Sequence, residues 1–233
     1  MRDPQERTAM VAAEPEAVQL DLLKTAVLVV DMQNAFVKKG GYFDLVGYDL
    51  SATLRSVEPC RKVITSARQK GAKIVYLQMG CSPDFSDKGP PDSPSVLKSK
   101  GLNLIRQRPE LKDRFYIYGT WGAEIIEELK PWSGDITVRK QKYDGFIGTN
   151  LEIILRTFAI KYLIFVGTAT NVCVESTLRH AFSLDYIPVL VSDAVSNAGS
   201  EATHQGTILN VRSHFGWVTT CDQLVRALED IQP

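Results

Sequence analysis

Residues 25–31 read TAVLVVD, an almost unbroken run of aliphatic and β-branched residues that ends in the carboxylate of Asp31. A run without polar alternation is typical of a strand that is covered on both faces of a parallel sheet. A glycine-rich loop at 40–42 follows, and apolar residues then recur at helical spacing until Gly71. This order of strand, loop and helix predicts the first unit of an α/β fold.

The same unit recurs along the chain. Further strands are predicted at 73–78, 135–139, 162–166 and 187–191, with helical patterns at 124–129, 151–158, 172–184 and 204–211. Strands that alternate with helices form a parallel sheet with right-handed crossovers. We therefore expect a three-layer α/β/α architecture with a mostly parallel central sheet. It would form a single domain over residues 21–233, after a partly ordered N-terminal arm over 1–20.

Composition and charge exclude several classes of protein. The chain has 27 Lys and Arg against 27 Asp and Glu, so no overall positive field attracts nucleic acid. Its apolar runs are far shorter than the roughly 20 residues of a membrane span, which argues against membrane insertion. The polar residues 1–16 contain no apolar core of a secretory signal. These features predict a cytoplasmic protein whose main partner is not nucleic acid.

One of the four cysteines stands at a position suited to catalysis. Cys173 follows the predicted strand 162–166 and a turn, and it falls at the start of the helical pattern 172–184. Unpaired backbone N–H groups and the helix dipole favour a thiolate there and can stabilise an oxyanion. Cys60 is predicted to lie in the core. Cys221 is predicted to be structural because no apolar strand precedes it, and Cys81 either lines a pocket or has no role.

Two charged side chains are predicted to lie at the same edge of the sheet as Cys173. Asp31 ends the first strand, and Lys140 directly follows the strand 135–139. Ligands of open parallel sheets bind beyond the carboxyl ends of the strands, where these groups converge. Asp31 would act as the base, while Lys140 would favour the ionised sulfur. The histidines at 180, 204 and 214 are less well placed, which leaves a Cys/His dyad as a weaker alternative.

Three motifs in this order resemble the isochorismatase-like cysteine hydrolases: VVDMQNAF at 29–36, KQKYDGF at 140–146 and GTATNVCV at 167–174. The similarity covers residues 25–228. Stretches at 40–51, 170–182 and 214–218 further resemble the ureidoacrylate amidohydrolases of pyrimidine degradation. The resemblance implies that Cys173 is the nucleophile, Asp31 the general base and Lys140 the third member of a triad. It also implies a cis peptide between Thr168 and Ala169, with the N–H groups of Ala169 and Cys173 as oxyanion hole.

The resemblance further implies cysteine-dependent hydrolysis of an amide or ureido C–N bond in a small molecule, without a cofactor. The protein would be a homo-oligomer, either a dimer or a tetramer. No metal is expected, since residues 80–88 lack the histidine that metal-binding nicotinamidases carry there. The expected substrate contacts are Asn34, Phe36, Gln78 and Tyr143.

Two residues depart from the ureidoacrylate amidohydrolase pattern. Met79 and Cys81 stand where that group is expected to have an amide and a tryptophan, which makes one pocket wall less polar. A larger or aromatic amide is therefore an alternative substrate, and a non-catalytic metabolite-binding member is an alternative function. The loop 80–101 is either a lid near the site or an irregular excursion.

Overall fold

The fold is that of a parallel sheet between two layers of helices. The computed structural model describes residues 7–197 and 199–231. Six parallel strands form the central sheet in the order β5-β4-β3-β6-β7-β8. Their bounds are β3 Thr25–Val30, β4 Lys73–Met79, β5 Ile136–Lys140, β6 Tyr162–Thr168, β7 Ile187–Ser196 and β8 Trp217–Thr219. Every residue of β3 is buried, as its unbroken apolar run predicts.

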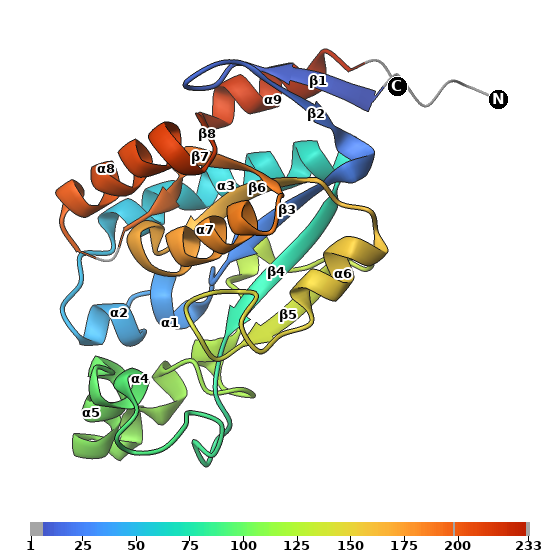
Figure 1. The fold of residues 1–233 in the computed structure, drawn as a ribbon. Coiled ribbons are helices and arrows are strands. Elements are labelled where there is room, and N and C mark those ends of the chain that lie inside the picture. The colour runs from blue at the N-terminus through green and yellow to red at the C-terminus, as the bar shows by residue number, and fades with distance from the viewer. Residues whose placement is uncertain (1–6, 198, 232–233) are drawn as a thin grey trace.

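Helices cover both faces of this sheet. The longer ones are α3 (Ser51–Gln69), α6 (Leu151–Thr157), α7 (Glu175–Ser183), α8 (Glu201–Asn210) and α9 (Cys221–Glu229). In Figure 1, α3 lies behind the strands, whereas α6 and α7 lie in front of them. The predicted three-layer α/β/α architecture is therefore confirmed. Among the described residues, no helix combines the length and the apolar character needed to cross a bilayer.

A set of short elements lies beyond the carboxyl ends of the strands. Helices α1 (Asn34–Val37) and α2 (Tyr42–Leu45) follow β3, and α4 (Pro94–Leu97) and α5 (Lys100–Gln107) follow β4. Figure 1 shows α4 and α5 together at one end of the molecule, past the tip of β4. These elements surround the end of the sheet where the predicted site lies.

The segment 124–129 is not the helix that its pattern predicts. Only Glu127–Leu129 forms a turn of 3-10 helix, and the residues before it are extended. The N–H of Ile126 donates to the carbonyl of Met32 at 3.0 Å, and the carbonyl of Glu124 accepts from the N–H of Asn34 at 2.9 Å. These bonds to a distant segment replace those of a helix, so tertiary pairing overrides the local pattern.

The described part of the N-terminal arm contains two strands from Thr8 onward. Strands β1 (Thr8–Val11) and β2 (Val18–Asp21) form an antiparallel hairpin whose inward residues are buried. The loop between them pairs with β8, because Glu14 and Val218 exchange backbone hydrogen bonds of 2.8 and 2.9 Å. The alternating burial explains why this stretch is ordered. The part of the predicted arm at 1–6 lies outside the described residues.

The edge strand β8 was not predicted, and it corrects the interpretation of Cys221. This cysteine does follow a strand, although one of only three residues. Its backbone N–H donates to Asp193 at 2.7 Å, and its thiol donates to the carbonyl of Pro59 at 3.6 Å. The Cys221 thiol is thus packed against α3, which agrees with a structural role.

Candidate active site

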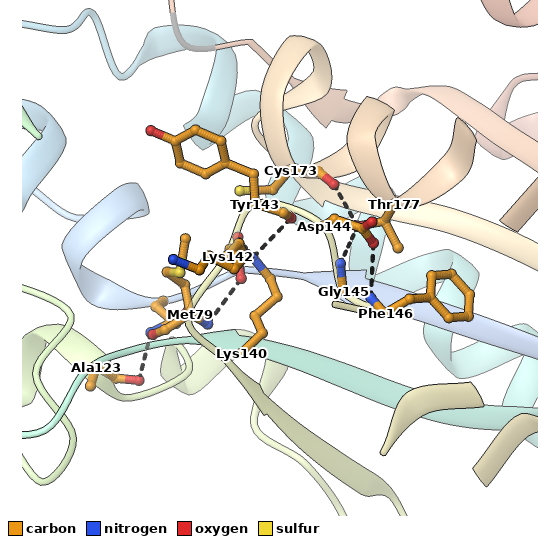
Figure 2. A network of polar contacts seen from close by, with 12 residues as sticks. Met79, Ala123, Lys140, Lys142, Tyr143, Asp144, Gly145, Phe146, Cys173 and Thr177 are labelled. Carbon is orange, nitrogen blue, oxygen red and sulfur yellow. Dashed lines mark hydrogen bonds and ion pairs between the residues drawn. The ribbon is translucent and has the colours of Figure 1, made fainter. Parts of the chain in front are cut away.

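Three strand ends bring an acid, a cation and a thiol together. Asp31 follows β3, Lys140 ends β5 and Cys173 follows β6. The Lys140 ammonium lies 2.8 Å from the carboxylate of Asp31, and their side chains are 0% and 2% exposed. Lys140 also donates to the carbonyls of Lys142 and Tyr143 at 3.2 and 3.3 Å (Figure 2). The ammonium group is therefore held by several acceptors at once.

Asp31 is held in a backbone conformation that is uncommon for a residue with a side chain. Its φ of 50° lies in the left-handed region. The N–H of Asp31 donates to the carbonyl of Leu77 at 2.9 Å, and its carboxylate accepts from the N–H of Met79 at 3.0 Å. Strained residues persist where the surroundings determine them strongly, and they are concentrated at functional sites. The end of β4 thus fixes the direction of the carboxylate.

Gln33 supports this arrangement, and the sequence analysis did not identify it. The residue is 0% exposed. Its side chain accepts from the N–H of Met79 at 2.8 Å and donates to the carbonyls of Met79 and Ala123 at 2.8 and 3.0 Å. A polar residue two positions after the strand-ending carboxylate was the available signal. Gln33 and Asp31 therefore accept from the same backbone N–H, that of Met79.

Cys173 lies where β6 turns into a helix. A π-helical turn, Thr170–Val174, leads directly into α7, and the cysteine is 7% exposed. Thr177 on α7 donates to the carbonyl of Cys173 at 2.7 Å and accepts from the N–H of Gly145 at 2.9 Å (Figure 2). This side chain ties the helix of the cysteine to the loop after Lys140. The expected cis peptide between Thr168 and Ala169 is present.

Opposing effects act on the pKa of the Cys173 thiol. Burial raises the pKa of Cys173 well above its usual range; the Lys140 ammonium opposes this shift, while the Asp31 carboxylate adds to it. Burial likewise raises the pKa of Asp31, against the opposing effect of Lys140. Desolvation therefore opposes the lowering of the thiol pKa that the helix start and the lysine are expected to produce. A carboxylate with a raised pKa is a better acceptor for the proton of the thiol.

A cavity of about 370 Å³ opens onto these groups, and we call it the site cavity. Asp31 and Cys173 line it, together with the predicted contacts Phe36 and Tyr143. The other two predicted contacts lie elsewhere. Within the described part of the chain, the amides of Asn34 and Gln78 do not line the site cavity, because they donate to the carbonyls of Trp121 and Ala123 at 2.9 and 2.8 Å.

Several lining residues were not predicted. They are aromatic residues that follow α1 or precede β5, and polar residues of the loop 80–101: Tyr42, Phe43, Tyr48, Tyr116, Lys88, Ser95, Lys98 and Ser99. The loop therefore forms one wall of the site cavity, as a position near the site predicts. Met79 also lines it. Cys81 does not line it among the described residues, because its thiol is buried beside the carbonyl of Tyr116 at 3.8 Å.

The described residues, 7–197 and 199–231, include side chains of the types that ligate metal ions. They contain no group of three or more His, Cys, Asp or Glu side chains arranged to hold a metal ion.

The chain belongs to the isochorismatase family, since the isochorismatase domain matches residues 25–223. It is 43% identical to the ureidoacrylate amidohydrolase RutB of Rhizobium rhizogenes, across 99% of this chain and 94% of that protein. It is 42% identical to the protein of the same name from Agrobacterium fabrum, across 95% and 97%. These matches confirm the resemblance that the three motifs indicate.

Solved structures agree with this assignment. A cysteine hydrolase from Pseudomonas syringae superposes with a TM-score of 0.75 at 29% identity, covering 91% of this chain and 96% of that one. An N-carbamoylsarcosine amidase from Thermoplasma acidophilum superposes with a TM-score of 0.63, also at 29% identity, covering 85% and 97%. The relatives are thus named as a cysteine hydrolase, an N-carbamoylsarcosine amidase and ureidoacrylate amidohydrolases.

Proposed function

We propose that this chain is a cysteine-dependent amidohydrolase that cleaves an amide or ureido C–N bond in a small molecule such as ureidoacrylate. The observation that carries the proposal is the contact between Asp31 and Lys140 at the wall of a cavity that Cys173 also lines. The similarity to two ureidoacrylate amidohydrolases over nearly the whole chain supports the substrate class.

In the proposed mechanism, Asp31 takes the proton of the Cys173 thiol as the sulfur attacks the substrate carbonyl carbon. The backbone N–H groups of Ala169 and Cys173 stabilise the resulting oxyanion. Asp31 then returns the proton to the leaving nitrogen, and an amine departs. Lys140 keeps Asp31 oriented and offsets the negative charge that moves between the carboxylate and the sulfur.

The acyl enzyme formed from a ureido substrate is a thiocarbamate on Cys173. Water that Asp31 deprotonates attacks this thiocarbamate, and the C–S bond breaks. The product is carbamate, which decomposes to carbon dioxide and ammonia. The thiol regains a proton, and the site returns to its starting state.

The test is ammonia release from ureidoacrylate, biuret and simple amides by the wild-type protein and a Cys173→Ala variant. We expect a loss of at least about 10³-fold in kcat, since removal of a nucleophile from a catalytic unit has effects of this order or larger. Cys221→Ala is the matched control, because this cysteine is also buried but lies outside the site cavity. Undiminished turnover by Cys173→Ala refutes the mechanism. Binding of ureidoacrylate without any turnover by the wild type would instead support the non-catalytic alternative.

A larger or aromatic amide is the second candidate substrate, and the wall of the site cavity favours it. Phe36 stacks on Tyr116 with ring centroids 5.4 Å apart, and Tyr42 packs edge-on against both rings. Met79 adds an apolar thioether to the lining. Aromatic and thioether groups favour planar apolar ligands. A comparison of kcat/KM for ureidoacrylate and for aromatic primary amides separates the two candidates.

The cytoplasmic location and the dimeric or tetrameric state stay predictions. Exposed Phe182 and Leu209 offer apolar surface for an interface, and Phe182 contacts Phe215 at a centroid distance of 5.8 Å. Light scattering coupled to size exclusion measures the oligomeric state. A monomer at micromolar concentration would contradict that part of the proposal.

A further inference from the structure

A lysine of the loop 80–101 is buried in the wall of the site cavity. Lys88 is 7% exposed and lines the same cavity as Asp31 and Cys173. Among the described residues, its ammonium group makes no hydrogen bond and no ion pair within 4.0 Å. Its close neighbour is the ring of Tyr116, whose centroid lies 4.6 Å away.

Such a group is costly unless something else compensates it. An ammonium removed from water needs an anion or several hydrogen-bond acceptors to recover its lost hydration. The face of an aromatic ring recovers only part of this loss. Burial accordingly lowers the pKa of Lys88, although Cys81 and Asp87 act in the opposite sense. An anion that enters the site cavity would complete the missing interaction.

The carboxylates on the cavity wall already have cationic or hydrogen-bonding partners. Asp31 is paired with Lys140, and Asp144 contacts Nδ1 of His180 at 2.5 Å. Asp87, the sequence neighbour of Lys88, accepts from the N–H of Ser82 with both oxygens at 3.0 Å. None of these carboxylates forms an ion pair with the Lys88 ammonium, and Asp87 acts on it only at longer range.

Two further lysines increase the positive charge of this wall. Lys98 and Lys142 line the site cavity and are exposed, and the described residues place no carboxylate in an ion pair with either. Lys142 instead lies 3.4 Å from the hydroxyl of Ser95. The lysines at the rim would attract an anion, and the buried Lys88 would hold it.

We infer that Lys88 binds a carboxylate of the substrate, and that the site cavity therefore selects amide or ureido compounds that carry an acid group. The inference rests on the proposed function, which assigns the C–N bond to the end of the cavity at Cys173. A carboxylate bound at Lys88 would lie beside Tyr116. The stacked rings of Tyr116 and Phe36 would then face the part of the substrate that connects its carboxylate to its C–N bond.

The experiment compares ureidoacrylate with its methyl ester, in which the carboxylate charge is removed and the ureido group is kept. Ammonia release is measured for the wild type, Lys88→Gln and Lys88→Arg. In Lys88→Gln we expect the ratio of kcat/KM for the acid to that for the ester to fall about 10-fold or more, mainly through KM for the acid. Lys88→Arg keeps the charge and should recover part of this ratio.

Lys161→Gln is the matched control. Lys161 also lies over an aromatic ring, that of Tyr162 at 5.7 Å, but it is exposed at the start of β6, the opposite edge of the sheet. We expect the ratio to stay at the wild-type value in this control. An equal loss for acid and ester in Lys88→Gln, or the same change in Lys161→Gln, overturns the inference.

A binding measurement separates this inference from the proposed function. Calorimetry with Cys173→Ala protein uses ureidopropionate and its methyl ester, so it requires no turnover. Adding Lys88→Gln to this variant should weaken binding of the acid about 10-fold or more relative to the ester. If the wild type hydrolyses neither substrate, the proposed function fails, while this measurement still decides the role of Lys88. Equal weakening for acid and ester contradicts that role.

Discussion

Replacement of Lys140 by methionine tests the physical basis of the site most directly. Lys140 and Asp31 form an ion pair whose side chains are 0% and 2% exposed. The substitution leaves Asp31 as a buried charge without its cation. Removing one partner of a buried pair costs about 3–5 kcal/mol of unfolding free energy. For a chain of this size, that corresponds to a fall in Tm of roughly 6–20 °C.

The cost should depend on pH in a defined direction. Burial already raises the pKa of Asp31 above its ordinary value of 3.8 against the effect of Lys140, so removing Lys140 raises this pKa further. A raised pKa means that the folded state binds the proton more tightly than the unfolded chain. Stability then declines as the pH rises from 3.8 through the folded pKa. The variant should therefore lose more stability at about pH 8 than at about pH 5.

The assay is urea unfolding followed by tryptophan fluorescence and circular dichroism at both pH values. The double variant Asp31→Asn/Lys140→Met serves as the rescue, because it removes both charges together. It should be more stable than Lys140→Met at about pH 8, since no unpaired charge remains buried. A double variant less stable than the single one, or a single variant with an unchanged free energy of unfolding, would refute the reasoning.

Two further predictions concern the strand ends. Gly167 has a φ of 115°, and a Cβ there would lie 2.2 Å from the carbonyl oxygen of Val30, so Gly167→Ala should lower the unfolding free energy by about 2 kcal/mol or more in urea titrations. The control is Gly206→Ala, in α8 with open space around it, whose unfolding free energy should rise by about 0.5–1 kcal/mol. Equal losses of unfolding free energy in both variants would contradict the packing argument. Burial raises the pKa of Asp31 despite the opposing effect of Lys140, and a general base must be ionised to act. The acid limb of the pH profile of kcat/KM should therefore have its midpoint above pH 3.8. Full activity below that pH would argue against Asp31 as the base.

The strands of the sheet could be predicted from sequence because their signal is local. The apolar run of β3 needs no knowledge of its neighbours, and the same holds for β4 and β6. Parallel strands end at one edge, so their order in the sheet was not needed to expect Asp31, Lys140 and Cys173 near one another. The short edge strand β8 and the extended residues before Glu127 carried too little local signal, since hydrogen bonds to distant segments determine both.

The details of the site cavity depended on contacts that no local pattern contains. Asn34 and Gln78 belong to segments next to the site. Their side-chain amides, however, donate to backbone carbonyls that lie 87 and 45 positions further along the sequence, respectively. Lys88 and Tyr116 come from separate segments that meet only in the folded chain. Side-chain direction was therefore the part that sequence reasoning could not supply.

Sequence alone determined which residues end the strands, and hence which thiol, acid and cation share one edge of the sheet. Tertiary structure decided the rest: that Asn34 and Gln78 point away from the cavity, that Lys88 is buried in its wall, and that burial raises the pKa of the Cys173 thiol. The physical reason is the distance along the sequence over which each effect acts. Hydrophobic periodicity acts over a few neighbouring residues, whereas burial and desolvation sum over every segment packed around a group.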